Sequence, residues 1–151
     1  MDRQYAMVLN KTILILEDDL LTLSKLLERL SVLEQDQPYS LSTVILTNHK
    51  QVRELINNNS NLRFDIVLLD RDCKLNGSFH EYNIEQFGAD NIISISSVPE
   101  YNQEAQNRGV KRVILKDLKN RDEFADKVVT EIEKILNHSS LIASMRDFAH
   151  G

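Results

Sequence analysis

Five short runs of aliphatic and β-branched residues constrain the fold of this 151-residue chain more than any other feature of its sequence. A strand with one solvent-facing side alternates apolar and polar residues, whereas these runs are almost unbroken. Unbroken runs of this length are typical of parallel strands that are covered on both faces. The sequence therefore predicts five buried parallel strands, over residues 13–16, 41–46, 66–69, 92–95 and 113–115.

Amphipathic segments separate the runs, and their periodicity predicts helices. One stripe of leucines runs along the first segment at helical spacing and is expected to face the core. It consists of Leu20, Leu23, Leu26, Leu27, Leu30 and Leu33. Shorter helices are expected around Val52, Leu55 and Ile56, over 81–87, and over 99–108, where proline near the start and glycine just past the end are favourable.

The last helix is expected to begin after Asn120, a candidate N-cap. Its core stripe consists of Phe124, Val128, Ile132 and Ile135. The chain length fits one domain, because a core of this size buries about 70% of the unfolded surface. We expect residues 1–137 to form that domain and 138–151 to be a C-terminal tail or an extension of the last helix. The tail could cover a neighbouring face or a second subunit.

Strands that alternate with helices predict an α/β fold, an open doubly wound parallel sheet with helices on both faces. In such sheets the functional crevice lies at the carboxyl ends of the strands. Polar residues stand at four of these ends. They are Glu17, Asp18 and Asp19 after the first strand, Asp70, Arg71 and Asp72 after the third, Ser96 and Ser97 after the fourth, and Lys116 after the fifth.

Carboxylates gathered at one edge repel each other, by about 4 kcal/mol for an ionised pair at 4 Å and an effective dielectric constant of 20. A hard cation such as Mg²⁺ relieves this repulsion, because it prefers oxygen ligands and keeps waters that a phosphate can replace. A hydroxyl and an ammonium group nearby suit a phosphoryl group. Taken alone, each of these residues is also common as a solvated turn residue, so the prediction depends on their convergence.

Four segments of the sequence together resemble a known protein family. The segments ILILEDD (residues 13–19), IVLLDRD (66–72), ISISS (93–97) and VILK (113–116) resemble the signature blocks of receiver domains in two-component signalling. The resemblance implies a flavodoxin-like strand order of 2-1-3-4-5. It implies that Asp70 is the phosphoacceptor, that Ser96 is the switch hydroxyl and that Lys116 contacts the phosphoryl group.

The resemblance also implies a Mg²⁺ site formed by Glu17, Asp18 and Asp70, completed by the main-chain carbonyl of Asp72. It implies a histidine kinase or phosphotransfer protein as phosphoryl donor. We expect a stand-alone receiver that signals to a separate protein target, with a second copy of the chain, in a homodimer, as the alternative partner.

Several positions depart from the family pattern. Cys73 and Lys74 stand where receivers commonly carry Met-Pro, although Gly77 keeps the usual loop glycine. Val113 replaces the usual switch aromatic, and Asp117 replaces the proline that usually follows the lysine. The segment from residue 77 to 91 is shorter than the family's third helix and following loop. These differences predict altered signal readout.

Two other functions remain open. Asp70 and Asp72 match the D-x-D nucleophile and acid/base pair of haloacid-dehalogenase-like phosphatases, although the acidic pair beyond the lysine is not evident and no cap insertion is visible. A degenerate receiver that binds partners without phosphorylation is the other alternative.

The composition of the chain argues against several further classes of protein. A net charge of −5 argues against nucleic-acid binding, which needs a concentrated basic face. The single cysteine, Cys73, excludes an internal disulfide, and no apolar run approaches the roughly 20 residues of a membrane span. The four histidines lack metal-ligand spacing and are expected to be ordinary surface residues. We expect a cytoplasmic protein with neither nucleic-acid nor membrane partners.

Overall fold

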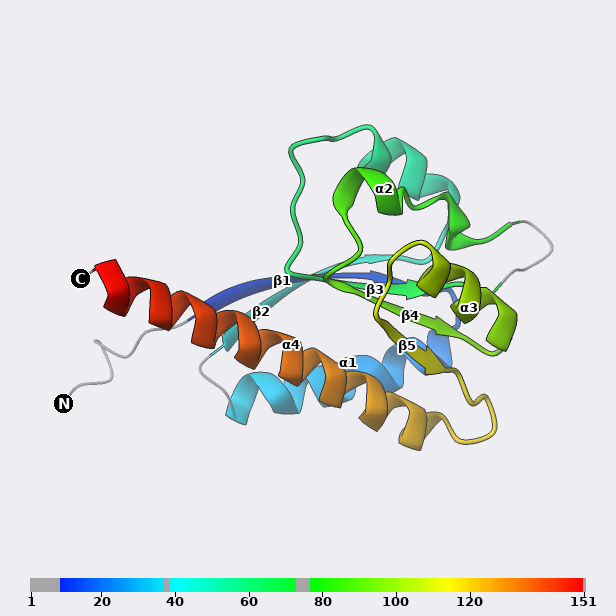
Figure 1. Ribbon diagram of the computed structural model, residues 1–151. Helices are drawn as coiled ribbons and strands as arrows, with labels where there is room; N and C mark the ends of the chain where they lie inside the picture. The colour runs from blue at the N-terminus through cyan, green and yellow to red at the C-terminus, as the bar shows by residue number, and fades with distance from the viewer. Residues whose placement is uncertain (1–8, 37–38, 73–76, 151) are drawn as a thin grey trace.

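A computed structural model of the protein describes residues 9–36, 39–72 and 77–150, with side chains through residue 138. Its centre is a five-stranded parallel sheet with the order β2-β1-β3-β4-β5 (Figure 1). Both the parallel pairing and the 2-1-3-4-5 order confirm the predicted fold class. The strands are β1 (Leu9–Leu16), β2 (Tyr39–Leu46), β3 (Ile66–Asp70), β4 (Ile92–Ser96) and β5 (Arg112–Leu115).

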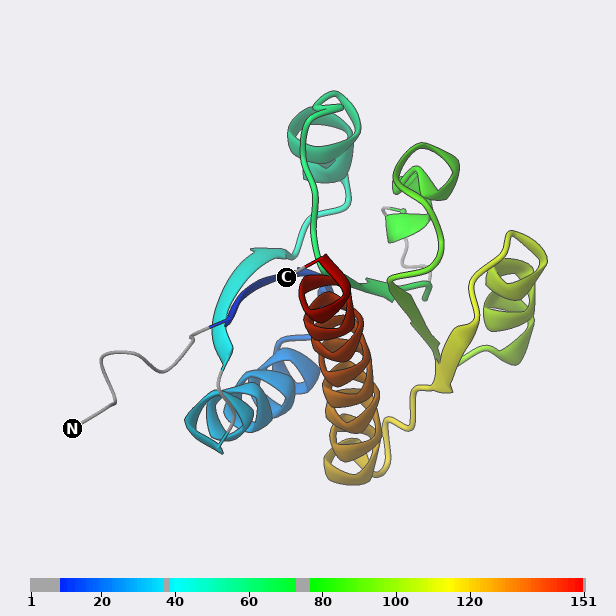
Figure 2. The same ribbon diagram turned by 60° about the vertical axis from the view of Figure 1, so that its left-hand side comes forward.

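Helices cover the sheet on both faces. Two long helices, α1 (Leu20–Asp36) and α4 (Arg121–His150), lie on one face (Figure 2). The shorter elements cover the other face. They are the π-helix η2 (Val52–Asn57), the 3-10 turn η3 (Phe79–Glu81), α2 (Ile84–Phe87) and α3 (Pro99–Asn107).

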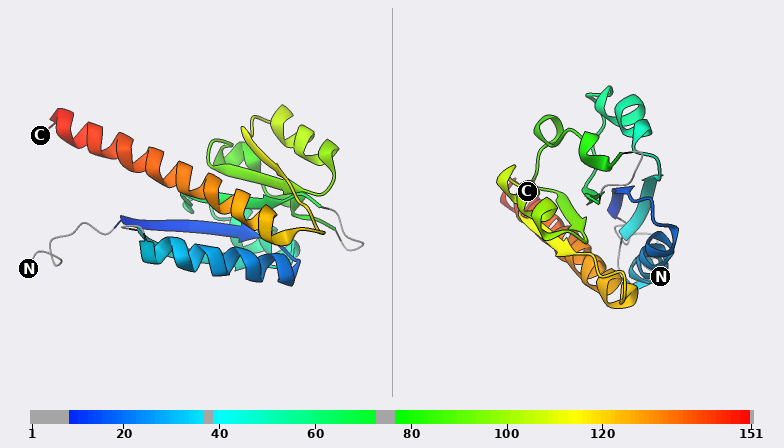
Figure 3. Two further views of the ribbon diagram at one scale, coloured as in Figure 1. Left: turned by 90° about the horizontal axis from the view of Figure 1, so that it is seen from below. Right: turned by 90° about the vertical axis from the view of Figure 1, so that its right-hand side faces the viewer.

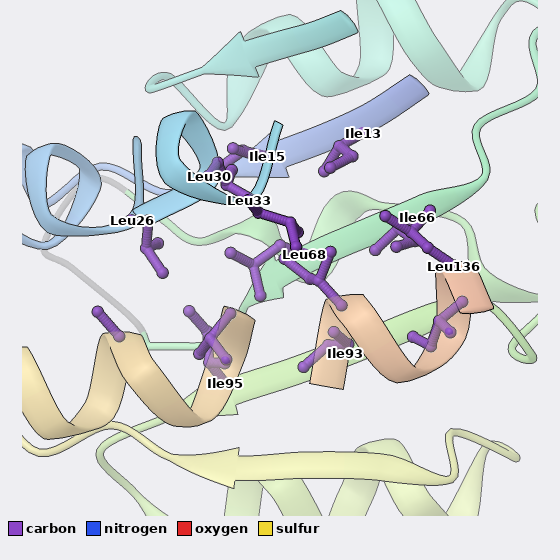
Figure 4. Close-up of a cluster of buried hydrophobic side chains, with 14 of the residues drawn as sticks. Ile13, Ile15, Leu26, Leu30, Leu33, Ile66, Leu68, Ile93, Ile95 and Leu136 are labelled. Carbon is purple, nitrogen blue, oxygen red and sulfur yellow. The ribbon is translucent and has the colours of Figure 1, made fainter. Parts of the chain in front are cut away.

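Each face of the sheet has its own apolar core, which explains the unbroken runs of the central strands β1, β3 and β4. The edge strands β2 and β5 are partly exposed, so the prediction of buried strands is wrong for these two. In β1, Ile13 and Ile15 pack towards α1 and α4, whereas Leu14 and Leu16 pack towards the shorter helices. Figure 4 shows the first of these cores, in which side chains of β1, β3 and β4 meet leucines of the two long helices. Each fully buried aliphatic side chain of this size contributes about 1.5–3 kcal/mol.

The leucine stripe of α1 is confirmed in its middle and wrong at its start. Leu23, Leu26, Leu30 and Leu33 are buried, but Leu20 is 69% exposed. Leu20 is the first residue of the helix, so no earlier turn helps to cover it. Leu55 of η2 is also exposed, while Val52 and Ile56 are buried, so only two of the three apolar residues in that segment face the core.

The third predicted helix is shorter than the range 81–87. The chain forms a 3-10 turn, Phe79–Glu81, and then a single helical turn, Ile84–Phe87. Asn83 caps that turn, since its side chain accepts a hydrogen bond from the Gln86 amide at 3.0 Å. Gly88 ends it with φ 91°, a conformation that side chains disfavour. This segment therefore presents loops where a longer helix was expected.

The last helix begins as predicted. The Glu123 amide donates a hydrogen bond to Asn120 Oδ1 at 3.3 Å, and all four residues of the predicted stripe are buried. The helix continues without a break to His150, and its end projects past the amino end of β1 (Figure 3). The domain boundary at residue 137 stays a prediction. Within the described part of the chain, no helix is both long and apolar enough to cross a membrane.

Candidate functional site

The carboxyl ends of β1, β3, β4 and β5 bring Glu17, Asp70, Ser96 and Lys116 to one edge of the sheet, and all four are buried. The Lys116 ammonium lies 2.7 Å from Glu17 Oε1 and 3.6 Å from Asp70 Oδ2. The backbone fixes this arrangement, because the Lys116 amide donates to the Ser96 carbonyl at 2.8 Å. One ammonium group therefore faces two buried carboxylates.

Asp18 adds a third carboxylate to this edge. Ligand oxygens of Glu17, Asp18 and Asp70 all lie within 4.8 Å of one another. Asp70 Oδ2 is buried and accepts no hydrogen bond from any described residue, although Asp70 Oδ1 accepts from the Asp72 amide at 3.0 Å. An oxygen-only donor set with an unsatisfied buried oxygen fits a hard divalent cation.

Burial, and then the negative charge of Glu17, raises the pKa of Asp70 to about 9, against the opposing charge of Lys116. Burial alone would lower the pKa of Lys116, but the charges of Glu17 and Asp70 outweigh it and the net pKa is raised. Lys116 therefore stays an ammonium ion while Asp70 keeps a proton at neutral pH in the absence of a cation. A cation at the acidic cluster favours the carboxylate form of Asp70.

Asp19, the last acidic residue after β1, has a different role in the structure. Its side chain accepts hydrogen bonds from the Thr22 hydroxyl and, at 3.1 Å, from Arg121 at the start of α4. Burial alone would raise the pKa of Asp19, but these contacts outweigh it, so the pKa is lowered. Asp19 therefore joins the starts of α1 and α4 beside the site.

Asp72 turns its carboxylate towards the end of β4. Oδ1 accepts from the Ser96 hydroxyl at 2.6 Å and from the Ser97 amide at 2.8 Å, and Oδ2 accepts from the Ser97 hydroxyl at 2.9 Å. A main-chain metal contact of Asp72 stays a prediction. Because its carboxylate is already engaged by three donors, Asp72 is poorly placed to act as the acid/base of a phosphatase.

Sequence reasoning missed two buried polar groups near the site. Arg71 is fully buried, and its guanidinium forms an ion pair with Glu104 Oε1 at 2.9 Å. Among the described residues, Nε and Nη1 donate to no acceptor. Asn102 of α3 accepts from the Ser94 hydroxyl at 2.8 Å and donates to the Ile114 carbonyl at 3.0 Å. These residues connect α3 to β3, β4 and β5.

The prediction of ordinary surface histidines is wrong for two of them. The His49 side chain is only 18% exposed, and its Nδ1 lies 3.2 Å from Glu81 Oε2. His80 is partly buried with its ring edge-on to Tyr101. Burial and the charge of Arg71 lower the pKa of His80. His49 lies in the loop between β2 and η2, and His80 lies in η3.

Of the positions that depart from the receiver pattern, Val113 is partly buried in β5 and Asp117 is exposed. Cys73 and Lys74 lie outside the described residues. Gly77 has φ 126°, and an added Cβ would come within 2.5 Å of the His49 ring. Glycine is therefore required here by both conformation and space.

Solved structures of similar fold include response regulators. The phosphorylated cyanobacterial phytochrome response regulator RcpA is 18% identical, with a TM-score of 0.63 over 83% of this chain and 92% of that one. The Mn²⁺-bound response regulator Rcp1 is 16% identical, with a TM-score of 0.59 over 78% and 91%.

A mutant of the receiver domain of the histidine kinase CKI1 from Arabidopsis thaliana is 14% identical, with a TM-score of 0.52 over 88% of this chain and 96% of that one. No family model matches the sequence, and no curated protein does so either. The structural neighbours show that this chain has the fold of response-regulator receiver domains.

Proposed function

We propose that this chain, which has the receiver fold, accepts a phosphoryl group on Asp70 and signals through an altered protein contact. One observation carries the proposal. Asp70 Oδ2 is buried, accepts no hydrogen bond within the described part of the chain, and lies at the strand ends beside two further carboxylates and a buried ammonium group. A purely structural carboxylate in this position would be expected to have its hydrogen bonds satisfied.

The proposed reaction is a transfer from a phosphohistidine of a histidine kinase or phosphotransfer protein. Asp70 Oδ2 attacks the phosphorus, the phosphorus–nitrogen bond breaks, and its electron pair leaves with the imidazole. The product is an aspartyl phosphate, a mixed anhydride. The Lys116 ammonium, 3.6 Å from Asp70 Oδ2, is positioned to stabilise negative charge on the phosphoryl oxygens.

We further propose Mg²⁺ as the cofactor, held by Glu17, Asp18, Asp70 and the main-chain carbonyl of Asp72. When bound, Mg²⁺ would neutralise charge on the transferring phosphoryl oxygens. The three carboxylates fit this ion by donor type and proximity. In its absence, Lys116 is the counter-ion of Glu17, 2.7 Å away.

The phosphoryl group would add a charge of about −2, and its oxygens would compete for the hydrogen-bond donors at the end of β4. This competition would change the surface near α3 and β5. We propose a separate protein target for that surface, a cytoplasmic location, and neither nucleic acid nor membrane as partner. A second copy of the chain is a further candidate partner.

The proposal is tested by intact-protein mass spectrometry after incubation with acetyl phosphate. Wild type with Mg²⁺ should gain a single phosphoryl group, whereas Asp70→Asn, or wild type with EDTA, should gain none. Asp90→Asn is a suitable control, because that carboxylate is exposed and lies just before the amino end of β4, whereas the site lies at the carboxyl ends of the strands.

Free phosphate measured in the same reaction separates the alternatives. Rapid repeated turnover without a lasting adduct would support a phosphatase. Neither adduct nor turnover would contradict the proposal and support a degenerate receiver.

A further inference from the structure

The Asp72 side chain connects the strand that carries Asp70 to the loop after β4. Its two oxygens accept hydrogen bonds from three donors, namely the Ser96 hydroxyl, the Ser97 amide and the Ser97 hydroxyl. The backbone amide of Asp72 donates to Asp70 Oδ1 at 3.0 Å. A single residue therefore contacts both the proposed phosphoacceptor and the end of the neighbouring strand.

The proton of the Ser96 hydroxyl is already engaged in this arrangement. The hydroxyl donates to Asp72 Oδ1 at 2.6 Å and accepts from the Val98 amide at 3.0 Å. A serine hydroxyl has one proton to donate, so while Ser96 donates to Asp72 it cannot donate to another acceptor. Ser96 is buried and directly follows Ile95, the register partner of Asp70 on β4.

We infer that Asp72 is a positioning residue that accepts the Ser96 hydrogen bond in the unmodified protein. A phosphoryl group on Asp70 must then replace Asp72 as the acceptor of this hydrogen bond. The inference rests on the proposed function of Asp70. A phosphoryl group offers charged acceptor oxygens for the same donor, and its charge repels the Asp72 carboxylate.

Release of Ser96 also affects Ser97, because both residues share the Asp72 carboxylate. The loop from Ser96 to Val98 leads directly into α3 at Pro99. Asp72 therefore couples the charge state of Asp70 to the start of α3. It also opposes the modified state, since its hydrogen bonds must break before Ser96 reaches the phosphoryl group.

The test uses beryllium trifluoride with Mg²⁺ as an anionic mimic of the phosphoryl group, and compares Asp72→Ala with Asp72→Asn by calorimetry. Both variants lose the negative charge, but asparagine keeps an oxygen that can hold Ser96 and the Ser97 amide. The alanine variant should bind the mimic about fivefold to tenfold more tightly than the asparagine variant, from the net strength of a hydrogen bond.

The same comparison in a Ser96→Ala background completes the cycle. There the difference between alanine and asparagine at position 72 should disappear. The inference would be overturned if Asp72→Ala and Asp72→Asn bound the mimic equally well while Ser96 is present. It would also be overturned if their difference in affinity persisted in Ser96→Ala protein. Circular dichroism checks that each variant is folded. If the wild-type protein binds no mimic, the proposed function itself is contradicted.

Amide hydrogen exchange tests the contact in unmodified, metal-free protein. The Ser97 amide should exchange about tenfold faster in Asp72→Ala than in wild type, because its acceptor is removed. In wild type the same amide should lose protection when the mimic binds. Unchanged Ser97 protection in the alanine variant would overturn the inference without bearing on the phosphoacceptor role of Asp70.

Discussion

Replacing Asp70 with asparagine should stabilise the metal-free protein at neutral to alkaline pH. Asp70 is 1% exposed and lies beside Glu17, and together burial and that charge raise its pKa to about 9 from an ordinary value of 3.8. Asparagine keeps the shape and one acceptor oxygen but is never ionised. Lys116 keeps its 2.7 Å ion pair with Glu17 in the variant.

The direction of this stability change follows from proton binding to Asp70 in the folded and unfolded protein. Between the unfolded and folded pKa values, the folded protein holds a proton on Asp70 that the unfolded chain has lost. Wild-type stability therefore falls as pH rises through this window, by up to about 1.4 kcal/mol per pH unit. The advantage of Asp70→Asn over wild type in free energy of unfolding should therefore grow by up to about 3 kcal/mol as the pH rises from about 6 to about 8.

Urea unfolding followed by circular dichroism, in EDTA, measures this difference across the pH range. Asp90→Asn is the matched control, since the Asp90 side chain is 93% exposed and should leave the pH slope unchanged. If Asp70→Asn keeps the wild-type slope, or is less stable than wild type at about pH 8, Asp70 does not carry a raised pKa and the electrostatic description of the site is wrong.

Three further predictions concern metal binding, the buried arginine and the core. Asp18→Asn should weaken Mg²⁺ binding by about tenfold or more while unfolding changes little; calorimetry with wild-type affinity would remove Asp18 from the metal site. Glu104→Gln leaves the buried Arg71 guanidinium without its only ion-pair partner among the described residues, and should lower the free energy of unfolding by about 1–3 kcal/mol; unchanged stability in urea would contradict this. Ile132→Ala should lower it by about 2–5 kcal/mol, and a loss below about 1 kcal/mol would show that α4 packs loosely.

The sheet could be predicted because its signal is physical and local. Strands covered on both faces need apolar residues at every position, and runs such as residues 66–69 have little other explanation in a chain of ordinary composition. The convergence of Asp70 and Lys116 then follows from topology, since parallel strands end at one edge. Leu20 and Leu55 were misplaced because periodicity gives the apolar face of a helix but not where its neighbours stop covering it.

The direction of individual polar side chains could not be predicted. Asp72 sits two residues after Asp70 on the same chain segment, yet its carboxylate contacts the end of β4, and only the loop geometry decides this. Arg71 carries no sequence signal of burial, because an arginine at a strand end is usually solvated. The resemblance to receivers suggested roles for residues, whereas the hydrogen bonds show which of them are already engaged.

Localising the phosphoryl group within the chain shows whether Asp70 is the phosphoacceptor. After incubation with acetyl phosphate and Mg²⁺, borohydride reduces an aspartyl phosphate to homoserine, and peptide mass spectrometry then locates the modified residue. The proposed function predicts homoserine at position 70 alone. Modification of another carboxylate, or none at all while the protein is folded and Mg²⁺ is bound, would contradict it.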